Sequence, residues 1–144
     1  MQVVLQRVSK ASVWVDSSQK GAIDHGWLAL IGVAKNDKET QVAYLARKII
    51  GLRGFRDDEG KMNKNIVDVG GSILAVSQFT LYGDTRKGNR PGFSQAAPPE
   101  LAKSLYDMLI DQLQQAIPVA TGVFGAMMEI RMVADGPVTL TIHG

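Results

Sequence analysis

Hydrophobic and polar residues alternate along the first part of the chain in the pattern of β-strands. Apolar side chains recur over Val3–Val8 and again over Ala11–Val15, which predicts two strands. Ser17–Gly21 contains small polar residues and a glycine, and it predicts a turn. Trp27–Val33 is apolar throughout, as expected of a strand that is buried on both faces.

The next segment changes to the spacing of an amphipathic helix. Apolar residues at i, i+3, i+4 and i+7 form one helical face: Val42, Leu45, Ala46 and Ile49. This pattern predicts a helix from about Lys38 to Ile50. Asn36 is the expected N-cap, because Glu39 follows three residues later as in a capping box.

A second helix is expected after a long surface loop. Residues 83–99 hold three glycines, three prolines and three basic residues with little periodicity, and loops of this length are usually functional. Pro98-Pro99-Glu100 is typical of a helix start, and Ile117-Pro118 of a helix end. One face of this helix carries Leu101, Leu105, Met108 and Leu109.

Three further runs predict strands. Ile73–Val76 is a buried strand bounded by glycines, and alternation over residues 128–132 and 138–142 predicts two strands joined across Asp135-Gly136-Pro137. Strands therefore outnumber helices. We expect an α+β fold formed by a single domain over residues 1–144, in which a curved or barrel-like sheet carries two main helices.

Composition narrows the chemistry that this chain can perform. The 144 residues are 45% hydrophobic and contain no cysteine, which excludes disulfides and thiolate nucleophiles. The two histidines, His25 and His143, lack the spacing of a zinc site, so no metal centre is expected. No run reaches the roughly 20 apolar residues of a membrane span, and the amino terminus lacks a leader pattern. We expect a soluble cytoplasmic protein.

Positive charge is concentrated in the middle of the chain. The formal net charge is +2, but nine basic residues and only five acidic ones lie between Arg47 and Arg90. A polyanion such as RNA is one natural partner for this region, because neutralised phosphates release counterions. A solvated surface with scattered lysine and arginine is the alternative. Arg86, Lys87 and Arg90 in the long loop are the candidates for phosphate contacts.

The most suggestive polar group follows the central apolar strand, at Ser77-Gln78-Phe79-Thr80. Ser77, the Gln78 amide and the Phe79 backbone N–H could converge as donors for a developing oxyanion in ester hydrolysis. Thr80 could act as a nucleophile, but no base is evident beside it, so direct attack by water is the competing mechanism. All four residues could instead only satisfy backbone groups at a strand end.

The chain resembles the D-aminoacyl-tRNA deacylases, also called D-tyrosyl-tRNA deacylases. Two motifs carry this resemblance: the Ser77–Thr80 segment, and Ala134–Thr139, which matches the family's Asn-x-Gly-Pro-Val-Thr except that Ala134 replaces the Asn. Supporting similarity lies in Gln6-Arg7-Val8, Lys61-Met62-Asn63, Lys87–Pro91 and Thr121–Ala126. The resemblance implies an α+β fold, a homodimer, a tRNA substrate, and hydrolysis of the D-aminoacyl ester without a cofactor.

The resemblance also implies how the substrate is selected. In the family the Gly-Pro bond is cis and reaches into the active site of the other subunit, so Gly136 and Pro137 would exclude an L side chain through their carbonyl oxygens. Arg7 would anchor this loop. Such a pocket would admit many D-amino acids and also glycine, for example on glycyl-tRNA(Ala). On sequence alone, Asp135-Gly136-Pro137 could also be an ordinary hairpin turn, and the chain could bind RNA without catalysis.

Overall fold

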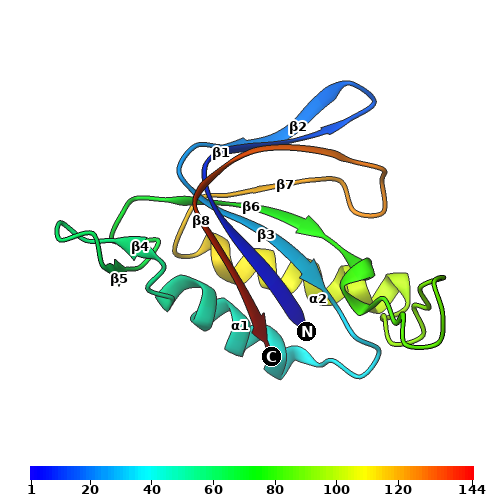
Figure 1. Ribbon diagram of the computed structural model, residues 1–144. Helices are drawn as coiled ribbons and strands as arrows, with labels where there is room; N and C mark the ends of the chain where they lie inside the picture. Colours follow the sequence, from blue (N-terminus) through cyan, green and yellow to red (C-terminus); the bar gives the residue numbers. More distant parts are fainter.

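The computed structural model describes residues 1–144, in which a strongly curved sheet packs against two helices (Figure 1). The strands of the sheet are β1 (Gln2–Val15), β2 (Ser18–Ile23), β3 (Gly26–Gly32), β6 (Ser72–Ser77), β7 (Val119–Thr121) and β8 (Glu129–His143). The helices are α1 (Glu39–Gly51), α2 (Pro99–Gln114) and the short 3-10 helix η1 (Phe79–Tyr82). A separate hairpin consists of β4 (Phe55–Arg56) and β5 (Met62–Lys64).

Strand β1 organises the sheet. One of its edges pairs antiparallel with β8, and its other edge pairs first with β3 and then with β2. Strand β6 lies parallel to β3 and to β7. Curvature brings β7 back onto β2, where a Cβ added to Gly21 would lie 2.6 Å from the Thr121 carbonyl oxygen. The prediction of an α+β fold with a barrel-like sheet and two main helices is confirmed.

Both faces of the central strands are buried. Trp27, Ala29 and Ile31 of β3 face the helices, where Leu45 and Leu109 belong to the same cluster. The alternate residues of β3 and β6 enter a second, smaller cluster inside the curl of the sheet: Leu28, Leu74 and Val76, with Val8 and Val13 of β1. Burial on both faces explains why β3 and β6 are apolar throughout instead of alternating.

The two predicted amino-terminal strands are one continuous strand, β1. The expected hairpin across Asp135-Gly136-Pro137 is wrong for a related reason. Residues on both sides of these three pair with the same partner, β1, so β8 continues in one direction from Glu129 to His143. The Gly-Pro segment is a local bulge within a long strand, and period-2 patterns cannot distinguish such a bulge from a turn.

Helix α1 begins at Glu39, and its N-cap is Lys38, not the predicted Asn36. The Lys38 backbone N–H donates to Gln41 Oε1 at 2.9 Å, so the terminal backbone group is satisfied by another side chain. The carboxylate of Asp37 instead fixes the start of the chain, 2.6 Å from the Met1 amino group. No helix has the length and apolar character needed to cross a membrane.

Candidate active site

The chain turns sharply where β6 meets η1, and this turn presents the polar segment identified in the sequence. Ser77 ends β6 opposite Ile31 of β3, whereas Phe79 and Thr80 belong to η1 and not to the strand. The Gln78 backbone N–H donates to the Ile31 carbonyl at 2.7 Å, which holds this residue against the sheet. Ser77 and Gln78 are half-buried, and Phe79 and Thr80 are exposed.

One side-chain contact within this segment bears directly on mechanism. Gln78 Nε2 donates a hydrogen bond to Thr80 Oγ1. The Gln78 amide donates in this contact, so it does not act as a base for the Thr80 hydroxyl, which keeps its proton and a second lone pair. The second N–H of the Gln78 amide makes no hydrogen bond within the chain and is available to a substrate oxygen.

Close packing between η1 and β3 sets the position of the segment. A Cβ added to Gly32 would lie 3.2 Å from the Gln78 carbonyl oxygen and equally close to side-chain atoms of Leu81 and Tyr82. Only glycine therefore lets η1 approach this closely without displacement. Burial and the charge of Asp37 raise the pKa of Tyr82 to about 12, so this phenol remains neutral at physiological pH.

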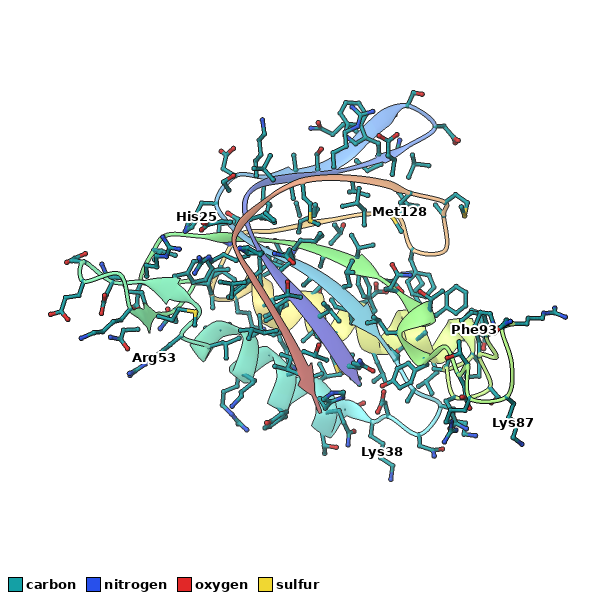
Figure 2. All side chains as sticks on the ribbon, viewed as in Figure 1. His25, Lys38, Arg53, Lys87, Phe93 and Met128 are labelled. Atoms are coloured by element: carbon teal, nitrogen blue, oxygen red, sulfur yellow. The ribbon has the colours of Figure 1, made fainter.

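The basic loop is folded back onto η1. Backbone N–H groups of Asp84 and Gly92 each donate to the other residue's carbonyl, at 2.7 and 2.9 Å, and close the loop at its base. The ring of Phe93 packs edge-on against Phe79, with centroids 5.0 Å apart. Figure 2 shows Phe93 and Lys87 together at this end of the molecule. The loop therefore places positive charge beside the candidate site.

The three predicted phosphate-binding residues are not equivalent. Arg86 contacts both carboxylate oxygens of Asp84, at 2.9 Å and 2.7 Å, and these hydrogen bonds hold the pKa of Asp84 well below its usual range. The pair is therefore close to neutral as a unit. Lys87 and Arg90 are exposed and lie within 4.0 Å of no carboxylate, so their full charge is available to a ligand.

Gly136 and Pro137 are joined by a cis peptide bond and bulge out of β8 opposite Arg7. Gly136 has a φ of +118°, which disfavours any other residue there. The side chain of Arg7 is 1% exposed. Its Nη1 donates to the Gly54 carbonyl at 2.7 Å, and its Nε lies 2.9 Å from the Asp135 carboxylate, as an ion pair without hydrogen-bond alignment.

Two residues that the sequence analysis named only as members of motifs, without a role, brace the Gly-Pro bulge. Gln6 Nε2 donates to the Val138 carbonyl at 3.2 Å, and Thr139 Oγ1 donates to Gln6 Oε1. Ala134, which replaces the family's asparagine, pairs with Val8 at the start of the bulge. The bulge is thus held from both ends without that asparagine. Alternation along β1 places Gln6 beside the bulge, but only the β1–β8 register reveals its partner.

The two groups of candidate residues do not meet within one chain. Gly136 lies opposite Arg7, which pairs with Trp27, and Trp27 pairs with Ile73 of β6. Ser77 is four residues further along β6, about 13 Å, and β8 is three strand spacings of about 4.8 Å away from β6. No group of three or more histidine, cysteine or acidic residues could hold a metal ion.

Comparison with known proteins extends over nearly the whole chain. Residues 4–143 match the family described as D-Tyr-tRNA(Tyr) deacylase. A D-aminoacyl-tRNA deacylase from Koribacter versatilis (strain Ellin345) is 54% identical over 143 residues, which cover 99% of this chain and 96% of that protein.

Two solved structures share the fold. One, titled c-Myc DNA Unwinding Element Binding Protein, superposes with a TM-score of 0.94 at 38% identity and covers 100% of this chain and 99% of its own. The other, described as a probable eukaryotic D-amino acid tRNA deacylase, has a TM-score of 0.85 at 17% identity, with coverage of 98% and 97%. At 17% identity the second similarity shows the fold alone.

Proposed function

The chain belongs to the D-Tyr-tRNA(Tyr) deacylase family, and from this premise we propose how its residues carry out the reaction. The enzyme hydrolyses the ester bond of D-aminoacyl-tRNA and releases a free D-amino acid and tRNA. One water molecule is consumed. Its oxygen bonds to the carbonyl carbon, the ester C–O bond breaks, and the departing ribose oxygen takes up a proton.

The amide of Gln78 is the observation that carries our assignment of the site. Its contact with Thr80 fixes the amide, and its second N–H remains available for the oxygen on which negative charge develops. Ser77 Oγ and the backbone N–H of Phe79 belong to the same turn and serve as further donors. Donors fixed before the reaction lose little free energy to reorganisation, which makes them effective in the transition state.

Water, not Thr80, attacks the ester in this mechanism. Thr80 Oγ1 accepts from Gln78, and neither histidine lies in this segment to act as its base. The tRNA itself supplies the missing proton transfer, because the 2′-hydroxyl of its terminal ribose is adjacent to the ester. A substrate ending in 2′-deoxyadenosine should therefore react much more slowly, and equal rates for the two sugars would exclude this assistance.

Selectivity arises from exclusion by the Gly136-Pro137 bulge. Its carbonyl oxygens occupy the space that an L side chain would need, and they leave the D side chain unconstrained. Glycine has no side chain to clash, so glycyl-tRNA(Ala) is also a substrate under this mechanism. Arg7 acts as a positioning residue, since its buried guanidinium links Asp135 to the Gly54 carbonyl.

The enzyme acts as a homodimer in which each bulge enters the active site of the other subunit. Three observations support this proposal. The Gly136 bulge and the Gln78 turn are far apart within one chain, and the outer edge of β8 has no partner strand in the chain. Met132 and Val133 of β8 are 49% and 47% exposed, and burial of such apolar residues favours association. The dimer acts in the cytoplasm, where aminoacyl-tRNA is used.

Replacement of Gln78 by alanine tests the assignment. We expect the single-turnover rate on D-tyrosyl-tRNA at saturation to fall by about 10²-fold, because one oxyanion donor is lost, with little change in tRNA affinity. The measurement compares rate and half-saturation concentration between wild type and variant. A loss of affinity with an unchanged saturating rate would contradict the oxyanion role.

A further inference from the structure

A group of basic residues at the carboxyl end of α1 has no role in the mechanism above. Arg47, Lys48 and Arg53 line an open cavity of about 340 Å³ together with Tyr44, Gly51 and Leu52. The three cations are exposed, and Tyr44 is 42% exposed beside them. We call this cavity the α1 basic cavity. It presents three positive charges and one aromatic ring on a single concave surface.

No carboxylate neutralises these charges. The acidic residues that follow in the chain are engaged elsewhere: Glu59 pairs with Lys61, Asp58 pairs with Lys64, and Asp57 accepts from Asn63. Arg47, Lys48 and Arg53 lie within 4.0 Å of no acidic oxygen. Their charge is thus free to attract a polyanion, unlike that of Arg86, which is balanced by Asp84.

The concave surface continues between the two helices. A second open cavity of about 670 Å³ shares Arg47 and Gly51 with the first and is also lined by Gln112 and Gln115 of the α2 end. Amide side chains beside cations suit a phosphodiester backbone, which offers both charge and hydrogen-bond acceptors. Basic residues near a helix C-terminus also offset the helix dipole. Arg53 lies beyond the end of α1, so the helix dipole does not account for its position.

The α1 basic cavity lies at the same end of the molecule as the Gly-Pro bulge. Arg53 precedes Gly54, whose carbonyl accepts from Arg7, and Arg7 pairs with Asp135 next to Gly136. In Figure 2, Arg53 is at the opposite end from Lys87 and Phe93. A subunit that inserts its bulge into a neighbour's active site therefore brings this cavity toward that site and away from its own.

We propose that the α1 basic cavity binds phosphates of the tRNA whose aminoacyl end occupies the partner subunit's active site. The inference rests on the proposed function, because it requires a dimer in which the bulge acts across the interface. One tRNA then contacts both subunits: the Lys87 and Arg90 loop beside the ester, and the α1 basic cavity of the other subunit along the RNA backbone. In this arrangement tRNA binds fully only when two subunits have assembled the active site.

The first test removes two charges from the cavity by Arg47→Gln and Arg53→Gln. Binding of uncharged tRNA should weaken about tenfold or more near 0.1 M salt, and the slope of log affinity against log salt should fall by up to about 2. Hydrolysis of 3′-O-(D-tyrosyl)adenosine should be unchanged, because this ester has no phosphate. Unchanged tRNA affinity and slope would overturn the proposal.

A matched control removes the same charge elsewhere. Lys10→Gln with Lys20→Gln takes two exposed cations from β1 and β2, and we expect little effect on tRNA binding. Equal losses in the two double variants would show a general effect of net charge and would overturn a specific site. Wild-type hydrolysis of the D-tyrosyl esters is measured separately. If the wild-type protein does not hydrolyse these esters, the proposed function is refuted. The binding comparison would still decide whether the cavity contacts RNA.

The second test determines which subunit the cavity serves. A mixed dimer pairs the Arg47→Gln/Arg53→Gln subunit with a Gln78→Ala subunit, isolated through two different affinity tags. Its one intact catalytic turn lies on the subunit with the damaged cavity. If the cavity serves the partner's site, half-saturation with D-tyrosyl-tRNA should match wild type. A half-saturation concentration raised to that of the Arg47→Gln/Arg53→Gln homodimer, or failure of the chains to associate, would overturn action across the interface.

Discussion

At the scale of single residues, the orientation of one amide separates two mechanisms. Gln78 donates to Thr80 Oγ1, so the amide takes no proton from the threonine hydroxyl, and the proposed mechanism uses water as the nucleophile. In the proposed mechanism the same contact fixes the amide as an oxyanion donor. The proposed mechanism thus gives Gln78 and Thr80 complementary roles: Gln78 stabilises the developing charge, and Thr80 positions the Gln78 amide.

Thr80→Val should consequently retain substantial activity. Valine matches the shape of threonine but removes the oxygen that Gln78 contacts, so we expect a fall in the single-turnover rate of no more than about tenfold. Thr80→Ser is the control, because it restores the hydroxyl. Intact-mass measurements during turnover should find no acylated protein. Complete inactivity of a folded Thr80→Val enzyme that still binds tRNA, or an acylated wild-type protein, would contradict direct attack by water.

The sequence predicted these residues because polar groups after a buried apolar run are conspicuous. It could not predict their partners. Gln6 braces the Val138 carbonyl, and Asp135 pairs with Arg7, across more than 125 positions of sequence in each case. Such contacts depend on the β1–β8 register, which is set by the whole sheet and not by local spacing. The motif could therefore be recognised in the sequence, but the long-range contacts that hold it in place could not.

At the scale of elements, the catalytic turn depends on how closely η1 packs against β3. Gly32 makes this approach possible, since an added Cβ would lie 3.2 Å from three separate groups of η1 and the preceding Gln78. These groups must shift by a few tenths of an ångström to accept a methyl group. Because Gln78 lies at this contact, a small displacement of η1 moves the proposed oxyanion donor.

Gly32→Ala should therefore slow catalysis more than it affects folding. We expect the single-turnover rate to fall about tenfold, since small errors in position are costly in a preorganised site. Affinity for tRNA should be nearly unchanged. Gly51→Ala is a matched control for the saturating rate only, because a Cβ at Gly51 meets nothing within 4 Å although Gly51 lines the α1 basic cavity. A wild-type rate for Gly32→Ala would show that the site does not depend on this packing.

The basic loop provides a separate prediction about charge. Lys87→Gln with Arg90→Gln should lower the salt slope of tRNA binding by up to about 2, since both cations are free of acidic partners. Adding Arg86→Gln should reduce the slope no further, because Asp84 already balances Arg86. Titration of tRNA binding against salt measures both effects. A third equal decrease on loss of Arg86 would contradict this distinction.

Helices and strands were predicted correctly where the sequence pattern is local, and the prediction was wrong where the structure depends on distant residues. Both main helices and β6 follow from their apolar spacing. The unbroken β8 does not, because Asp135-Gly136-Pro137 has the composition of a turn while β1 continues to pair on either side of it. The prediction of Asn36 as the N-cap was also wrong, because the Gln41 side chain accepts from the backbone N–H at the start of the helix.

At the scale of the whole molecule, the fold separates the two halves of the proposed mechanism. The catalytic turn and the basic loop lie at one end of the sheet, and the Gly-Pro bulge and the α1 basic cavity lie at the other. In the proposed mechanism neither end suffices alone. Pairing of two subunits through the exposed β8 edge would give each site a turn from one chain and a bulge from the other.

Mixed dimers test this account most directly, using Gly136→Ala to distort the bulge. Alanine is disfavoured at the φ of +118°, and its Cβ would lie 3.0 Å from Arg7 Nη2. The Gly136→Ala homodimer should hydrolyse both D- and L-tyrosyl-tRNA, and the Gln78→Ala homodimer should be nearly inactive. A mixed dimer of the two variants should regain one D-selective site, with D-tyrosyl-tRNA hydrolysed at about half the wild-type rate. A mixed dimer without a D-selective site would contradict selection across the interface.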